Sequence, residues 1–213
     1  QKINSLKEQI RPYKNDTHML VYCGATTISD PDYREGSVDE NEKKQINVVA
    51  EMLGNELGMR ISKFTSEESA QEREALKKAF DEGKHLQTLV AIRCLDEGVN
   101  IPSIKTAFIL ASSTNPKEYI QRRGRVLRKY PGKTKAVIYD FITLPIALNK
   151  VRNYPPEIIK STSGLVLREI ERMKDFANIS ENPWDVDSLI NQIEEIYNLN
   201  KFEGDDNYVG DRK

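Results

Sequence analysis

The sequence has few of the residue types that build disulfide-bonded or metal-binding proteins. It contains two cysteines and two histidines in 213 residues. Cys23 and Cys94 each lie in or beside an apolar stretch, without a CxxC pair or a Cys/His cluster. This pattern favours buried free thiols over a disulfide or a metal site, and a reducing compartment such as the cytoplasm.

Long apolar runs and an excess of one charge are also absent. No apolar stretch approaches the roughly 20 residues that cross a bilayer, so we predict no membrane-spanning segment. With 32 basic and 33 acidic residues the net charge is −1, so contact with a nucleic acid or nucleotide requires a local basic patch. The chain begins abruptly at Gln1 on a charged helical stretch, and we expect it to be a piece of a longer protein.

The sequence has no P-loop, the Gly-x-x-x-x-Gly-Lys-Thr/Ser motif that binds nucleotide phosphates. "GKT" occurs at 132–134, but Leu127 stands where the first glycine belongs, and the segment follows a helical pattern instead of a strand. We therefore predict a turn there. The "DEG" tripeptides at 81–83 and 96–98 do not follow the end of a strand directly, so neither is a magnesium-binding acidic pair.

Short apolar segments alternate with amphipathic ones over the first two thirds of the chain. We predict strands at 18–25, 58–65, 86–92, 104–112 and 134–142, and helices at 2–10, 39–57, 66–83 and 115–130. This alternation is typical of an α/β fold, with a parallel sheet covered by helices on both faces. The helix at 66–83 has the clearest ends: Ser69 and Glu72 fit a capping box, and Gly83 fits a stop.

After Pro145 the pattern predicts helices alone. One spans 155–180, loosely broken near Gly164, and a second spans 183–200. We expect a sheet domain at 1–145, a helical extension at 146–200 and a disordered tail at 201–213.

One stretch concentrates positive charge: "QRRGRVLR" at 121–128 has four arginines in eight positions. At about 100° per residue, Gln121, Arg125 and Arg128 share one helix face, and Gly124 borders it, leaving room for a close approach. Two guanidinium groups one turn apart form a clamp for a multiply charged anion. The alternative is an ordinary solvated basic face.

Several segments together resemble a known family. "YIQRRGRVLR" (119–128) resembles the last conserved motif of superfamily 2 helicases, Gln-x-x-Gly-Arg-x-x-Arg, and "LDEGVNIP" (95–102) resembles the motif before it. "FTSEESAQEREALKKAF" (64–80) and "LVYCGAT" (20–26) resemble the segments that precede these motifs. The ordered match identifies a RecA-like fold, of the P-loop NTPase type: the C-terminal domain of a superfamily 2 motor, in the restriction and repair branch of DEAD/DEAH-like helicases.

The resemblance implies that ATP with Mg²⁺ sits between this domain and an N-terminal RecA-like domain, expected upstream in the same parent chain. That missing half would carry the P-loop and the Mg²⁺ ligands. By motif position, Arg125 and Arg128 would be arginine fingers that stabilise charge on the transferring phosphoryl group. Gln121 would contact the γ-phosphate or the attacking water. We expect negligible ATPase activity from this chain alone.

Three further residues would lie near the nucleotide by the same resemblance: Gly98, Asn100 and Gly124. Asn100 stands where the family usually has an aspartate. Its amide accepts and donates hydrogen bonds but carries no charge, and whether it contacts the ribose or the arginine helix is open.

The resemblance also implies a nucleic-acid track over the top of the domain. Candidate contacts are Gly24, Ala25 and Thr26 after the first strand, and Thr65 and Ser66 after the second, since backbone amides and small hydroxyls suit phosphate oxygens. For Thr65 and Ser66 the alternative is helix capping. The branch implies DNA, and RNA stays open. The competing function is a module that binds nucleic acid or a partner without hydrolysis.

Overall fold

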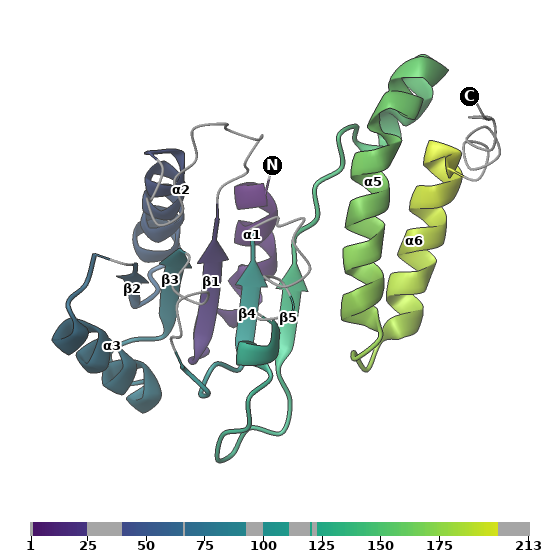
Figure 1. The fold of residues 1–213 in the computed structure, drawn as a ribbon. Coiled ribbons are helices and arrows are strands. Elements are labelled where there is room, and N and C mark those ends of the chain that lie inside the picture. The colour runs from purple at the N-terminus through teal and green to yellow at the C-terminus, as the bar shows by residue number, and fades with distance from the viewer. Residues whose placement is uncertain are drawn as a thin grey trace, which may run out of the picture. The chain divides into compact units, whose positions relative to one another are not determined.

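The computed structural model describes residues 2–24, 40–65, 67–92, 100–110, 120 and 123–199, with side chains from residue 45 onward in the second range. The chain divides into two compact units, Gln1–Phe141 and Ile142–Lys213. The first is the α/β unit and the second is helical (Figure 1). The expected disordered tail at 201–213 lies outside the described residues.

The first unit is built on a five-stranded sheet in the order β2-β3-β1-β4-β5. The strands are β1 (Met19–Cys23), β2 (Ile61–Phe64), β3 (Thr88–Ile92), β4 (Thr106–Ile109) and β5 (Val137–Asp140), listed here in chain order. All four pairings are parallel. The five predicted strands and their parallel arrangement are confirmed, and each strand is shorter than predicted because its apolar stretch runs on into a turn or loop.

Helices cover the sheet of the first unit (Figure 1). They include α1 (Lys2–Ile10), the 3₁₀ turn η1 (Arg11–Tyr13), α2 (Glu40–Glu51) with its π-helical end η2 (Met52–Glu56), and α3 (Ala70–Glu82).

The central strand β1 is buried on both of its faces. Met19, Val21 and Cys23 belong to one core cluster with residues of α1 and α2. Leu20 and Tyr22 alternate with them and point to the opposite face, yet each is only 1% exposed. Both faces are therefore covered, as a parallel sheet requires.

The prediction for the cysteines is confirmed at Cys23, which is a buried free thiol. Burial raises the pKa of this thiol to about 12, so it stays protonated at neutral pH and packs as a small apolar residue. Cys94 lies outside the described residues.

Both ends of α3 follow the predicted signals. The Ser69 hydroxyl accepts from the amide of Glu72 at 3.3 Å, and the Ser69 amide donates to the Glu72 carboxylate at 2.8 Å. The bond from the Ser69 amide to the carboxylate is the largest cause that lowers the pKa of Glu72, and the nearby Ser69 hydroxyl adds to it. At the other end Gly83 has φ +67°, a left-handed conformation that glycine adopts without a Cβ clash. These caps fix where α3 begins and ends.

The second unit contains the 3₁₀ turn η3 (Leu148–Asn153) and two helices, α5 (Pro156–Ala177) and α6 (Pro183–Tyr197). Its core includes Ile159, Val166 and Ile170 of α5. The predicted break near Gly164 is wrong, because α5 is continuous. One glycine costs a helix about 1 kcal/mol, less than the burial of this apolar stripe supplies. Among the described residues, neither these helices nor those of the first unit are long and apolar enough to cross a membrane.

Candidate functional site

The arginine segment, residues 121–128, has a buried side chain at Val126 and an exposed surface around it. Residues 123–126 are helical, and the side chain of Val126 is fully buried, which fixes the segment to the unit. Arg128 and Gly124 are exposed, and Arg125 is half-buried. A Cβ placed on Gly124 would meet no heavy atom of the described structure within 4 Å, consistent with room for a close approach. Gln121 lies outside the described residues.

The helix ends earlier than the predicted residue 130. Residue 127 is a turn, and residues 128–130 are not helical. The next four residues, "YPGK" at 130–133, form a β-turn: the Lys133 amide donates to the Tyr130 carbonyl at 3.0 Å, and Gly132 has φ +75°. Proline second and a positive-φ glycine third are the signature of a type II turn. Since a residue before proline disfavours helical geometry, the helix stops first, and the prediction that "GKT" is a turn is confirmed.

The loop that begins at Asn100, in the last part of "LDEGVNIP", packs against the core. Ile101 is 4% exposed, and Ile104 and Ser103 are fully buried. The Ser103 hydroxyl donates to the carboxylate of Asp81 near the end of α3. Asn100, at the start of this loop, is exposed. The buried residues of the loop therefore fix the position of the exposed Asn100 amide. Gly98 lies outside the described residues.

Asn100 and the arginine segment meet directly. The Arg128 guanidinium donates to the Asn100 side-chain oxygen across 28 residues of chain. Of the two contacts left open for Asn100, the one with the arginine segment is therefore present. Because the acceptor is a neutral amide, the bond does not cancel the arginine's charge, and it is weaker than a bond to a carboxylate.

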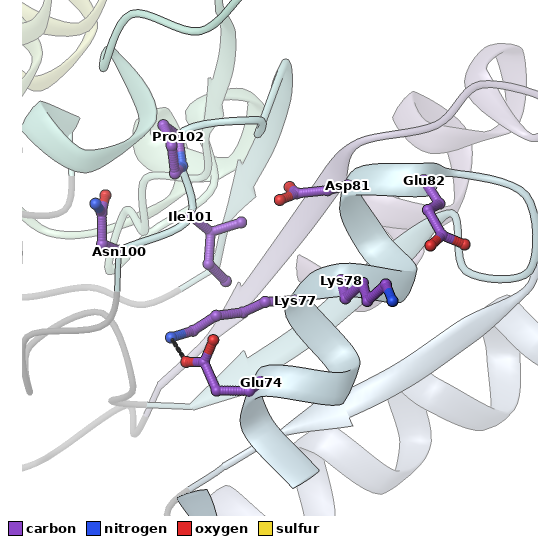
Figure 2. Close-up of a pocket in the computed structure, with 8 residues that line it drawn as sticks. All are labelled: Glu74, Lys77, Lys78, Asp81, Glu82, Asn100, Ile101 and Pro102. Carbon is purple, nitrogen blue, oxygen red and sulfur yellow. Dashed lines mark hydrogen bonds and ion pairs between the residues drawn. The ribbon is translucent and has the colours of Figure 1, made fainter. Parts of the chain in front are cut away.

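A pocket of 580 Å³ lies between α3 and the Asn100 loop. In Figure 2, α3 forms one wall, and Asn100, Ile101 and Pro102 form the other. The α3 wall carries both signs of charge, and its Lys77 pairs with Glu74 at 2.6 Å. The described residues contain no group of three His, Cys, Asp or Glu side chains able to hold a metal ion.

Lys133 contacts both the arginine segment and the Asn100 loop, although its sequence context predicts only a turn. Its ammonium group donates to the carbonyls of Val126 at 2.5 Å, Arg128 at 3.0 Å and Pro102 at 3.2 Å. The partial burial that this involves lowers the pKa of Lys133. A lysine just beyond a helix C-terminus, delivered by a Pro-Gly turn, was the available sequence signal.

The described nucleic-acid candidates lie at the carboxyl ends of β1 and β2. The Gly24 amide donates to the Gln45 side chain at 3.2 Å. The Thr65 amide donates to the Glu68 carboxylate at 2.6 Å, and its hydroxyl donates to the same group at 3.0 Å. The N-cap of α3 is Ser69, so the capping alternative is wrong at Thr65, and a phosphate contact there stays a prediction. Ala25, Thr26 and Ser66 lie outside the described residues.

Comparison with known proteins places this site in a family. The model of the family "Helicase conserved C-terminal domain" matches residues 1–130, more than half of the chain. The chain is 29% identical over 108 residues to the DNA 3'-5' translocase XPB2 of Sulfurisphaera tokodaii. The aligned region covers 48% of this chain and 24% of that protein. It is 36% identical over 81 residues to putative helicase 22 of Sulfolobus islandicus filamentous virus, 38% of this chain and 14% of that protein.

A solved structure supports the fold over nearly the whole chain. The C-terminal domain of the DEAD-box protein Dbp5 is similar with a TM-score of 0.52, covering 90% of both chains at 19% identity. The chain spans about a quarter or less of the curated relatives it matches. Together with the parallel five-stranded sheet and the family match, these similarities show that the chain belongs to the helicase conserved C-terminal domain family, as the C-terminal RecA-like domain of a superfamily 2 protein.

Proposed function

We propose that this chain is the C-terminal motor half of an ATP-dependent superfamily 2 DNA helicase or translocase. Arg125 and Arg128 act across a cleft on ATP that an N-terminal RecA-like domain of the same parent chain holds. The observation that supports this most is the bond between Arg128 and Asn100. It joins the two family motifs into one exposed, positively charged site.

The described residues fit phosphate oxygens better than a metal ion. Two guanidinium groups and a neutral amide supply hydrogen-bond donors and positive charge, whereas no carboxylate cluster for Mg²⁺ occurs in the described ranges. Bound ATP with Mg²⁺ supplies the phosphoryl group that is transferred to water. Arg125 and Arg128 stabilise the charge that develops on that group. Gln121 orients the water or a γ-phosphate oxygen, while Gly98 and Gly124 let the nucleotide come close.

We place the nucleic-acid track at the carboxyl ends of β1 and β2, on Gly24, Ala25, Thr26, Thr65 and Ser66. In a parallel sheet these ends lie at one edge. The similarity to a protein named a DNA translocase supports DNA as the track. Because Glu68 holds the amide and hydroxyl of Thr65, a phosphate at Thr65 must displace that carboxylate.

A second candidate function is a module that binds nucleic acid or a partner without hydrolysis. The neutral Asn100 in the place of the family's usual aspartate is the observation that favours it. The two candidates differ in whether turnover depends on the arginine segment.

The test is ATP turnover by the full-length parent protein, with and without DNA, for the wild type and Arg125→Ala. We expect a fall of about 10³-fold in kcat with nucleotide binding largely retained, as for arginine fingers elsewhere. Arg152→Ala, which removes an exposed arginine of η3, is the matched control. Unchanged turnover in Arg125→Ala would make the segment a surface patch and favour the binding module. Robust turnover by the present chain alone would contradict the missing-half proposal.

A further inference from the structure

The ammonium group of Lys133 joins two segments of the site that are far apart in sequence. Two of its carbonyl acceptors, Val126 and Arg128, lie at the end of the arginine segment. The third, Pro102, belongs to the loop that begins at Asn100. A lysine ammonium has three N–H donors, and here three carbonyl oxygens accept from it.

The local structure explains why Lys133 is in this position. The type II turn at 130–133 reverses the chain directly after the arginine segment and directs the lysine back toward its end. The last carbonyls of a helix have no partner within the helix and carry partial negative charge. The Lys133 ammonium satisfies the Val126 carbonyl at the helix end and the Arg128 carbonyl two residues beyond it, and the Pro102 oxygen extends the contact to the opposing loop.

Arg128 is held at two points, through its backbone carbonyl and through its guanidinium group. Lys133 holds the Arg128 carbonyl, and the Arg128 guanidinium bonds to Asn100. Since Pro102 lies two residues from Asn100, the lysine fixes the backbone on both sides of the Arg128–Asn100 pair. Partial burial of the ammonium, which lowers its pKa, agrees with a lysine enclosed by these carbonyls.

We propose that Lys133 is a positioning residue that sets the place of Arg128 relative to Asn100 and the bound nucleotide. This inference rests on the proposed function, because it assumes that Arg128 acts on ATP. Lys133 touches neither substrate nor reacting atoms and acts only through the backbone of its neighbours.

The experiment measures kcat and KM for ATP in the full-length parent protein carrying Lys133→Met, with Lys129→Met as the matched control. Lys129 is an exposed lysine four residues away, so the control removes the same charge without the three carbonyl contacts. We expect kcat to fall about 10- to 100-fold in Lys133→Met, since small misplacements of catalytic groups have effects of this size. The KM for ATP should change less than about threefold, because an interaction realised in the transition state affects kcat. Lys129→Met should match the wild type.

A double-mutant cycle separates positioning from a general loss of structure. In the Arg128→Ala background, Lys133→Met should lose most of its effect on kcat, because the residue it positions has been removed. Lys133→Gln, which keeps N–H donors without the charge, should show an intermediate kcat and covers the case in which Lys133→Met does not fold.

The outcomes distinguish the two proposals. If Arg128→Ala lowers kcat and folded Lys133→Met or Lys133→Gln retains the wild-type value, the positioning role is overturned and the proposed function stands. If the effects of Arg128→Ala and Lys133→Met on kcat multiply fully, Lys133 does not act through Arg128 and the inference is likewise overturned. If Arg128→Ala has no effect on turnover, the proposed function and this inference both fail.

Discussion

The two units of the chain use polar side chains in different ways. In the helical unit, the Tyr197 hydroxyl is fully buried, donates to the Ile146 carbonyl and accepts from the Ile146 amide at 3.0 Å. In the α/β unit, the hydrogen bond between Arg128 and Asn100 joins two exposed side chains. The first kind of contact satisfies buried groups and stabilises the fold. The second kind holds charge at the surface, where it can meet a ligand, so its loss should affect activity more than stability.

The largest effect on stability is expected from Tyr197→Phe in the helical unit. Without the hydroxyl, the buried amide and carbonyl of Ile146 lose this partner, and leaving such groups unsatisfied costs about 1–3 kcal/mol. The free energy of unfolding, measured on the present chain by urea denaturation and circular dichroism, should fall by that amount. The kcat of the folded parent protein should stay at the wild-type value, and a clear drop in kcat would break the contrast between the units.

The next effect is expected at Asn100 and should appear in turnover. Asn100→Leu removes the acceptor for Arg128 at similar size, and we expect kcat to fall about tenfold, the equivalent of one hydrogen bond of about 1.4 kcal/mol. Asn100→Asp keeps an acceptor and should stay within about threefold of the wild type, since a charge-assisted bond replaces the neutral one. Equal losses in both variants would show that the amide has a role other than accepting from Arg128.

The smallest effect comes from a matched pair of helical glycines, Gly124 in the α/β unit and Gly164 in the helical unit. A Cβ on either would meet no described heavy atom within 4 Å, and alanine is favoured over glycine in helices by up to about 1 kcal/mol. Thermal unfolding of the present chain should therefore show unchanged or slightly raised stability for both Gly→Ala variants. Turnover of the parent should fall only for Gly124→Ala, because the added methyl group would face the nucleotide. A loss of turnover in Gly164→Ala would contradict this assignment.

Sequence reasoning was most successful where one local signal decided the structure. The strands β1, β3 and β4 are buried along their whole length, and unbroken apolar stretches predicted them. The caps of α3 required only Ser69, Glu72 and Gly83 at the right spacing. Prediction from the sequence failed where distant contacts outweighed a local signal. The α5 helix continues through Gly164 because its apolar stripe packs into the core of the helical unit.

The sequence by itself determined the α/β class, the succession of strands and helices along the chain, and the motifs that mark the helicase C-terminal domain. These follow from apolar periodicity, turn residues and motif spacing, all of which act over a few residues. Only the tertiary structure decided that Arg128 meets Asn100 and that Lys133, which the local turn directs to Val126 and Arg128, also reaches Pro102. The Arg128–Asn100 and Lys133–Pro102 bonds join residues 28 and 31 positions apart. The packing of the sheet brings such residues together, and no local pattern in the sequence records that proximity.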